Sequence, residues 1–200
     1  FGDGESKVCL TGGGSLNAVA VDVPADISSA AFFLVGASIA QGSDLLLEHV
    51  GINPTRIGVI NILREMGADI ELLNETISGG EPVADLRVKY APLHGIEIPL
   101  EQVPLAIDEF PVLFVAAAVA DGQTLLSGAE ELRVKESDRI QVMADGLAIL
   151  GVEVEVTPDG IIIEGGDSFS GGTVESHGDH RISMSFAIAA LRATAEIEIL

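Results

Sequence analysis

The sequence predicts an α/β fold of repeated βαβαββ units, with three buried apolar helices surrounded by sheets and outer amphipathic helices. Three observations support this prediction. Strand-like and helix-like segments follow one another in the same order twice and begin a third copy, with a period of about 75 residues. The helix-like segments are of two kinds, one apolar nearly all round and one amphipathic. Turn sequences such as Pro158-Asp159-Gly160 separate strand-like segments.

The first unit spans about residues 15–91. Val19, Val21 and Val23 alternate with polar or small residues, as in a half-buried strand, and Pro24 ends this run. One of Asp26, Ser28 or Ser29 can cap the following helix. The expected elements are a strand over 16–23, a helix over 29–40, a strand over 43–50, a helix over 56–67, and strands over 69–73 and 84–90 joined by a Gly-Gly-Glu-Pro loop.

The second unit (about 92–166) repeats this order, and a third (167–200) begins it but lacks an outer helix and a final hairpin. The expected elements are strands over 96–100, 124–127, 152–156, 161–163, 173–176 and 196–200, and helices over 109–120, 137–150 and 181–192. The first helix of each unit is apolar nearly all round, which predicts that it is enclosed, whereas the second is amphipathic and is expected outside. The unfinished third unit predicts an exposed edge or a partner segment.

The N-terminal stretch is expected to lie outside these units. Residues 8–11 read as a short strand that ends at Gly12-Gly13-Gly14. A phosphate-binding glycine loop should lead into a helix, but this one leads into another strand-like run. We therefore interpret the glycines as a flexible joint and a domain boundary.

The composition excludes several classes of function. The formal net charge of −21 argues against nucleic acid and anionic membranes as partners, because both would be repelled. The apolar run 112–120 is much shorter than the roughly 20 residues needed to span a bilayer. The single cysteine, Cys9, favours a reducing compartment, and the start of the chain does not have the pattern of a signal peptide. We expect a cytoplasmic protein without a metal site or organic cofactor.

Cations are concentrated at two strand-to-helix junctions. The chain has only ten Lys and Arg residues, and three of them lie in the segment 132–140 (Leu-Arg-Val-Lys-Glu-Ser-Asp-Arg-Ile). A fourth, Arg181, lies in the similar junction Gly178-Asp179-His180-Arg181. Helix N-termini favour bound anions through their free N–H groups. Although a solvated charged face is the simpler interpretation of one such run, we expect both junctions to belong to one anion site.

These junctions and the repeat resemble the C-terminal domain of the 5-enolpyruvylshikimate-3-phosphate synthases. Residues 132–140 and 178–182 carry the most specific part of the resemblance, with support from 24–33 and Ile107-Asp-Glu-Phe-Pro. The resemblance implies that residues 1–14 are the tail of an N-terminal domain plus a hinge. Residues 15–200 would be an incomplete C-terminal domain, and the missing N-terminal domain of the same protein would be its partner.

The family transfers the enolpyruvyl group of phosphoenolpyruvate to the 5-hydroxyl of shikimate 3-phosphate in aromatic amino acid biosynthesis, and is the target of glyphosate. The resemblance implies that Arg139 and Arg181 bind phosphoenolpyruvate and that Lys135 serves shikimate 3-phosphate and the developing charge. It also implies that Asp108 accepts the hydroxyl proton, Glu136 handles the proton at the vinyl carbon, and His180 contacts the leaving phosphate or supports the site. No cofactor is implied.

Each of these roles has a structural alternative. Asp108 could cap the helix that starts near Glu109, and Glu136 could be a salt-bridge partner of Arg133 or Arg139. His180 could be a structural histidine, and Arg139 a surface pair on its helix. Glu131 stands where some members carry an uncharged residue that contacts shikimate 3-phosphate. The alternative classes of protein are a UDP-N-acetylglucosamine enolpyruvyl transferase-like enzyme, an RNA 3′-phosphate cyclase, and a non-catalytic anion-binding module.

Overall fold

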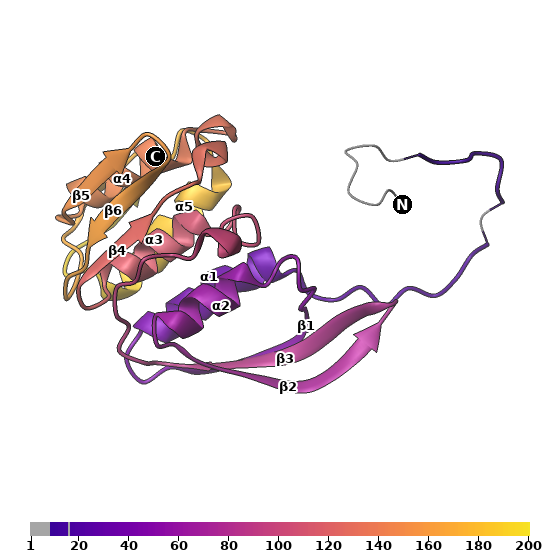
Figure 1. The fold of residues 1–200 in the computed structure, drawn as a ribbon. Helices are drawn as coiled ribbons and strands as arrows, with labels where there is room; N and C mark the ends of the chain where they lie inside the picture. The colour runs from indigo at the N-terminus through magenta and orange to yellow at the C-terminus, as the bar shows by residue number, and fades with distance from the viewer. Residues whose placement is uncertain (1–8, 16) are drawn as a thin grey trace.

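Three central helices form the core of the protein. The computed structural model describes residues 9–15 and 17–200, and Figure 1 shows the helices with the sheets around them. The helices α1 (Ile27–Ile39), α3 (Phe110–Ala118) and α5 (His180–Ala189) pack against one another. Each is the first helix of its unit, so the structure confirms the repeat and its order. Every residue of α3 is buried, which agrees with its apolar sequence.

The strands of each unit form a separate sheet. In the first two units the last three strands pair antiparallel in the same spatial order, with the final strand in the middle. In the third, two strands pair in parallel. The sheets are β1 (Asp44–Gly51), β3 (Glu81–Lys89) and β2 (Asp69–Ser78); β4 (Gln123–Leu126), β6 (Gly160–Glu164) and β5 (Val154–Thr157); and β7 (Gly172–Val174) with β8 (Ile197–Ile199).

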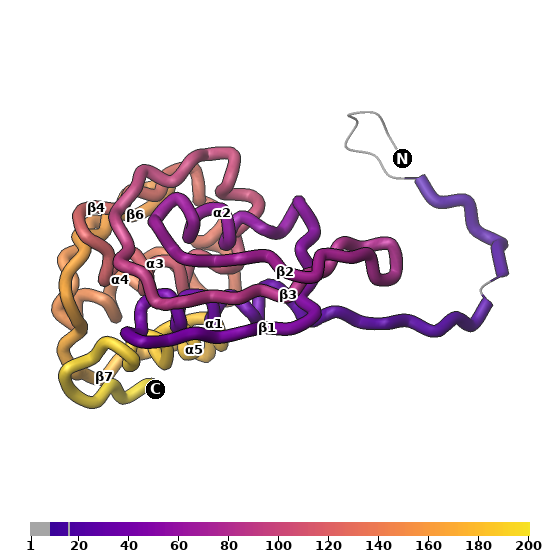
Figure 2. The backbone as a smooth tube through the Cα atoms, turned by 90° about the horizontal axis from the view of Figure 1, so that it is seen from below, coloured from indigo at the N-terminus to yellow at the C-terminus, as the bar shows by residue number. Residues whose placement is uncertain are grey.

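The first strand of units one and two is shorter than expected. Residues 17–23 and 96–100 do not form the predicted strands: Ala25 forms one parallel bridge with Val50, and Glu97 forms one with Leu125. Leu16, where the first predicted strand began, lies outside the described residues. Pro99 has no N–H to donate, and the chain enters the 3₁₀ turn η1 (Leu100–Gln102) directly after it. Residues 17–23 pair with no strand: the segment comes in from outside the sheets (Figures 1 and 2) and reaches them at Asp22, which contacts Ser78 of β2 and His49 of β1. An alternating sequence becomes a strand only where a neighbour pairs with it and covers its apolar face.

Two more expectations about strands need correction. Residues 9–11 are not in a strand, and Val8, where that predicted strand began, lies outside the described residues. The β2–β3 hairpin is longer than predicted, because both strands continue to a tight turn at Gly79-Gly80 and the Glu81-Pro82 part of the expected loop belongs to β3. Gly79 and Gly80 both have positive φ, which this turn requires and glycine adopts at no steric cost.

The second helices lie outside, as their amphipathic sequences predict. They are α2 (Gly58–Glu65), which packs on α3, and α4 (Arg139–Ile149), which packs on α3 and α5. The 3₁₀ turn η2 (Glu130–Val134) precedes α4, so this helix starts two residues later than expected. A Cβ added to Gly146 would lie 2.2 Å from Phe186 Cζ. This glycine therefore lets α4 approach α5 closely, which brings the first residue of α4 near the start of α5.

The helix α5 is less enclosed than predicted. Only Ile182, Ser185, Phe186 and Ala189 of this helix are buried, and Leu191 in the following turn η3 (Ala190–Arg192) is 55% exposed. The apolar sequence of this segment forms one wall of a groove against α1, because the third unit has no second helix in residues 9–15 and 17–200 to cover it. In this described part of the chain, no helix is long and apolar enough to cross a membrane.

Candidate functional site

The N-terminal ends of the three central helices meet at one end of the molecule. The hydroxyl of Ser28, at the start of α1, donates to Glu109 Oε1 next to α3 at 2.5 Å. Nη1 of Arg181, at the start of α5, donates to the carbonyl oxygen of Asp108 at 2.9 Å. Each helix N-terminus carries a partial positive charge of roughly half an elementary charge. The repeat therefore places three such ends around one point, which favours anions there.

Local sequence explains why these helices begin where they do. The carboxylate of Asp26 accepts from the backbone N–H of Ser29 and caps α1. Asp179 accepts from the N–H of Arg181 and caps α5, and Asp138 accepts from the N–H of Gln141 and caps α4. An aspartate at this position satisfies N–H groups that have no partner within the helix.

Arg139 is a fully buried cation surrounded by three carboxylates. Its side chain is 1% exposed. Nε donates to Asp179 Oδ2 at 2.9 Å, Nη1 to Asp108 Oδ1 at 3.3 Å, and Nη2 to Glu136 Oε2 at 2.5 Å. Asp179 is fully buried, whereas Asp108 and Glu136 are 41% and 57% exposed. Two of the three anionic partners are thus open to exchange with an incoming anion.

Asp179 holds both arginines, and this role was not predicted from the sequence. One carboxylate oxygen accepts from Arg139 Nε and from Ser137 Oγ, and the other accepts from the backbone N–H of Arg181. Burial by itself raises the pKa of this carboxyl, but the hydrogen bonds outweigh it and the pKa lies below its usual value. The sequence signal was an aspartate at a helix start within the cation-rich junction, which identifies a cap but not a buried ion pair.

Lys135 lies between two carboxylates. Its Nζ is 2.5 Å from Glu131 Oε1 and 3.5 Å from Asp108 Oδ1. The hydrogen bond to Glu131 is the main cause that raises the pKa of the Lys135 ammonium, and the charge of Asp108 adds to it. We call Lys135, Arg139 and Arg181, together with the carboxylates of Asp108 and Asp179 that bind them, the cation cluster. Lys135 directly follows η2, and the other members lie at or next to the starts of α3, α4 and α5.

The other two arginines and the histidine of the two junctions differ in their contacts. Arg181 lies beside Asp108 and is 16% exposed. His180 is the first residue of α5 and is exposed, and no hydrogen bond of its side chain occurs within the described residues. Arg133 belongs to a different contact: it donates to the carbonyls of Thr157 and Pro158 and pairs with Asp138. This arginine fastens η2 to the β5–β6 turn, so one of the four cations is structural.

The geometry also decides among the structural alternatives. Asp108 is not the cap of α3, because Glu109 occupies that position and makes no capping bond. Glu136 is indeed a salt-bridge partner of Arg139, three residues further on. Arg139 is no surface pair, since it is buried. Arg139 and Arg181 are neighbours that share Asp108 and Asp179 as partners.

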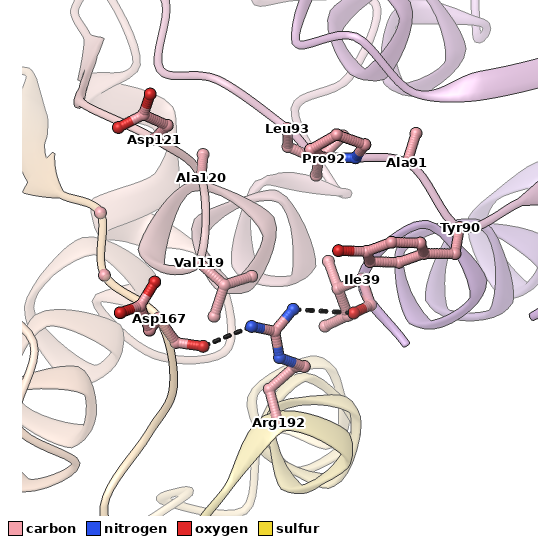
Figure 3. Close-up of a pocket in the computed structure, with 12 residues that line it drawn as sticks. Ile39, Tyr90, Ala91, Pro92, Leu93, Val119, Ala120, Asp121, Asp167 and Arg192 are labelled. Atoms are coloured by element: carbon pink, nitrogen blue, oxygen red, sulfur yellow. Dashed lines mark hydrogen bonds between the residues drawn. The ribbon is translucent and has the colours of Figure 1, made fainter. Parts of the chain in front are cut away.

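A pocket at the other end of the central helices is unrelated to this cluster. It has a volume of about 420 Å³, and Figure 3 shows Ile39, Val119 and Arg192 around it, which lie at or near the C-terminal ends of α1, α3 and α5. Arg192 donates Nη1 to the Ile39 carbonyl at 3.0 Å and Nη2 to the Asp167 carbonyl. A cation at helix C-termini complements their negative ends, so this arginine stabilises the fold. In residues 9–15 and 17–200, no group of three or more His, Cys, Asp or Glu side chains could hold a metal ion.

Together the fold and the cluster define an α/β domain built from βαβαββ repeats, with three cations gathered around Asp108 near the starts of its central helices. The model of the EPSP synthase (3-phosphoshikimate 1-carboxyvinyltransferase) family matches residues 2–200, and the chain belongs to this family.

Known proteins of that family are close in sequence and structure. A 3-phosphoshikimate 1-carboxyvinyltransferase of Methylococcus capsulatus is 68% identical over 194 residues, which are 97% of this chain and 44% of the relative. One of Alkalilimnicola ehrlichii is 68% identical over 193 residues, 96% of this chain and 43% of the relative. A solved EPSP synthase from Acinetobacter baumannii superimposes with a TM-score of 0.91 at 61% identity, covering 95% of this chain and 44% of that one. The chain thus spans less than half the length of these relatives.

Proposed function

We propose that this chain is the C-terminal substrate-binding part of a cytoplasmic 3-phosphoshikimate 1-carboxyvinyltransferase. The complete enzyme would join phosphoenolpyruvate and shikimate 3-phosphate and release phosphate. The observation that carries the proposal is the convergence of Lys135, Arg139 and Arg181 on Asp108 at the starts of the central helices. Both substrates are anions, and a site with fixed cations and helix N-termini stabilises them without reorganising during the reaction.

Arg139 and Arg181 are proposed to bind phosphoenolpyruvate. The Nη1 and Nη2 atoms of Arg139 contact the exposed carboxylates of Asp108 and Glu136. A carboxylate or phosphate of the substrate can take their place, because a guanidinium binds two oxygens of such a group side by side. Asp179 would keep Nε in position throughout the exchange. Lys135 is proposed to bind shikimate 3-phosphate and to stabilise the charge that develops.

The chemistry assigned to the carboxylates is proton transfer. Asp108 would take the proton of the 5-hydroxyl of shikimate 3-phosphate while the oxygen of that hydroxyl bonds to C2 of phosphoenolpyruvate. Glu136 would at the same time deliver a proton to the vinyl carbon C3. In the second step Glu136 would take a proton back from C3 as the bond between C2 and the phosphate oxygen breaks, and phosphate would leave. His180 is proposed to contact that phosphate. Displacement of Glu136 from Arg139 by the substrate would free this carboxylate for its role.

Residues 1–14 are proposed to be the tail of the N-terminal domain plus the hinge, and residues 15–200 an incomplete C-terminal domain. The repeat supports this division. In units one and two the second helix packs on a neighbouring central helix, but the groove between α5 and α1 exposes Phe33 and Leu191. A further helix of the complete protein would cover this groove. The other wall of the catalytic site would come from the missing domain, so we expect no turnover by the purified 200-residue chain.

The test is a titration of the ¹⁵N-labelled chain with phosphoenolpyruvate and with shikimate 3-phosphate, followed by NMR chemical shifts. We expect weak, saturable changes around Asp108, Lys135 and Arg139 that Arg139→Ala abolishes. Lys135→Gln serves as a second variant, because its side chain is not buried. Changes that both variants leave untouched would contradict the proposed site. Synthase activity of the chain alone would contradict the need for a second domain.

A further inference from the structure

Glu109 is a buried carboxylate to which the proposed chemistry assigns no part. Its side chain is 6% exposed, and it stands at the cap position of α3 without accepting a backbone N–H there. A buried carboxylate needs hydrogen bonds or a counter-charge to offset its lost hydration. Oε1 receives both, because the Ser28 hydroxyl donates to it at 2.5 Å and Arg181 Nη1 lies 3.7 Å from it. Glu109 thus joins the first turn of α1 to a side chain of α5.

Ser28 is itself held in place. Its Oγ accepts from Nη2 of Arg56 at 2.8 Å, and the same Arg56 nitrogen lies 3.1 Å from Asp26, the cap of α1. The hydroxyl therefore accepts from Arg56 while it donates to Glu109. A continuous series of polar contacts runs from Asp26 through Arg56, Ser28 and Glu109 to Arg181.

The contacts with Asp108 and Glu109 occupy one nitrogen of the Arg181 guanidinium and leave the other two without a hydrogen bond within the described residues. Nη1 is engaged by the Asp108 carbonyl and by the charge of Glu109. In the part of the chain that the structure describes, Nε and Nη2 make no hydrogen bond. The Nε–Nη2 edge presents two parallel N–H groups, the arrangement that binds a carboxylate or phosphate most firmly. Arg139 differs, because all three of its nitrogens are engaged by carboxylates.

We propose that Glu109 is a positioning residue for Arg181: held by Ser28, it fixes Nη1 so that the Nε–Nη2 edge faces the anionic substrate. This inference rests on the proposed function for the identity of the anion, but not for the contact itself. The groups that face Glu109 are Ser28, Arg56, Arg181 and the neighbouring Asp108. Burial is the main cause that raises the pKa of the Glu109 carboxyl, against the opposing effects of Ser28 and Arg181.

The experiment measures the mobility of the Arg181 side chain separately from ligand binding. The Nε–Hε signal of Arg181, assigned with Arg181→Lys, is followed in ¹⁵N-labelled full chain by its heteronuclear NOE. We expect a rigid side chain in the natural sequence and a mobile one in Glu109→Gln and Glu109→Ala. Glu65→Gln is the matched control, because Glu65 is an exposed glutamate at the end of α2. If Glu109→Ala fails to fold, Glu109→Gln decides, since the amide keeps the shape and still accepts from Ser28.

Titration with phosphoenolpyruvate gives the second measurement. We expect the dissociation constant to rise about tenfold in Glu109→Ala, the effect of losing one charge-assisted contact, and less in Glu109→Gln. An unchanged Nε–Hε NOE in folded Glu109 variants overturns the inference, whatever the ligand does. If the natural chain binds no phosphoenolpyruvate but Arg181 loosens in the variants, the proposed substrate is wrong and the positioning role stands.

Discussion

Replacing Asp179 by alanine tests the central contact of the site. Asp179 and Arg139 are 0% and 1% exposed and lie 2.9 Å apart. Alanine at this position would leave the buried guanidinium facing only Asp108 and Glu136, and would remove the cap of α5. Breaking a buried ion pair on one side typically costs about 3–5 kcal/mol, because the remaining charge stays buried without its partner.

This cost can be measured by urea unfolding followed by circular dichroism. If the free energy of unfolding falls by about 2 kcal/mol per M urea, the expected loss of stability lowers the urea concentration at the unfolding midpoint by about 1.5–2.5 M. The matched control is Asp44→Ala, which removes an aspartate paired with Arg87 at 2.7 Å when both side chains are about half exposed. Because water screens such a pair, its loss should shift the midpoint far less. Equal shifts in the two variants would show that Asp179 is not the buried anchor of the cluster.

Two further predictions concern the charges around the cluster. Because burial raises the folded-state pKa of Glu109, its stabilising contribution is complete below the usual value of 4.5 and is lost as the pH rises through the raised pKa. Glu109→Gln should therefore gain stability relative to the natural chain as the pH rises above 4.5 and through the raised pKa, measured by urea unfolding, and parallel pH profiles would contradict this. Glu131→Gln should lower the Lys135 pKa and tighten binding of inorganic phosphate, because Glu131 is the first cause of the raised pKa. Both effects can be followed by NMR of ¹³C-methylated lysines, and an unchanged Lys135 titration would contradict the prediction.

The fold could be predicted from the sequence to a large extent, because the local distribution of apolar residues distinguishes an enclosed helix from an outer amphipathic one. The apolar segment 112–117 and the amphipathic segment 56–67 differ in how their apolar residues are distributed, and the structure confirms one as enclosed and the other as outside. The first strands of units one and two and the full enclosure of α5 were wrongly predicted. Their outcome depends on what covers them, and residues 17–23 have an alternating pattern but no pairing strand.

For the site, charge spacing predicted which residues gather but not how they pair. The neighbourhood of Arg139 and Arg181 was predicted from two cation-rich junctions, and the structure confirms it. The buried ion pair of Asp179 with Arg139 and the hydrogen bond of Arg133 to the Thr157 carbonyl could not be predicted. The Asp179–Arg139 contact depends on how closely α4 approaches α5, which a glycine–phenylalanine contact between residues 40 positions apart permits. The Arg133 contact joins η2 to the β5–β6 turn, 24 and 25 residues further along the chain. Sequence spacing along one helix contains no information on such a distance.

The strong acidity of the chain does not conflict with an anion site. A net charge of −21 repels anions at long range, but surface charges more than about 10 Å away are largely screened at 0.1 M salt. Within that range a substrate at the proposed site would meet Lys135, Arg139 and Arg181 together with three helix N-termini. The carboxylates of Asp108, Glu136 and Glu131 neutralise these cations while no ligand is bound. In the proposed function, substrate binding would therefore exchange one anionic partner for another, with Asp179 and the helix ends fixed and only the half-exposed carboxylates moving.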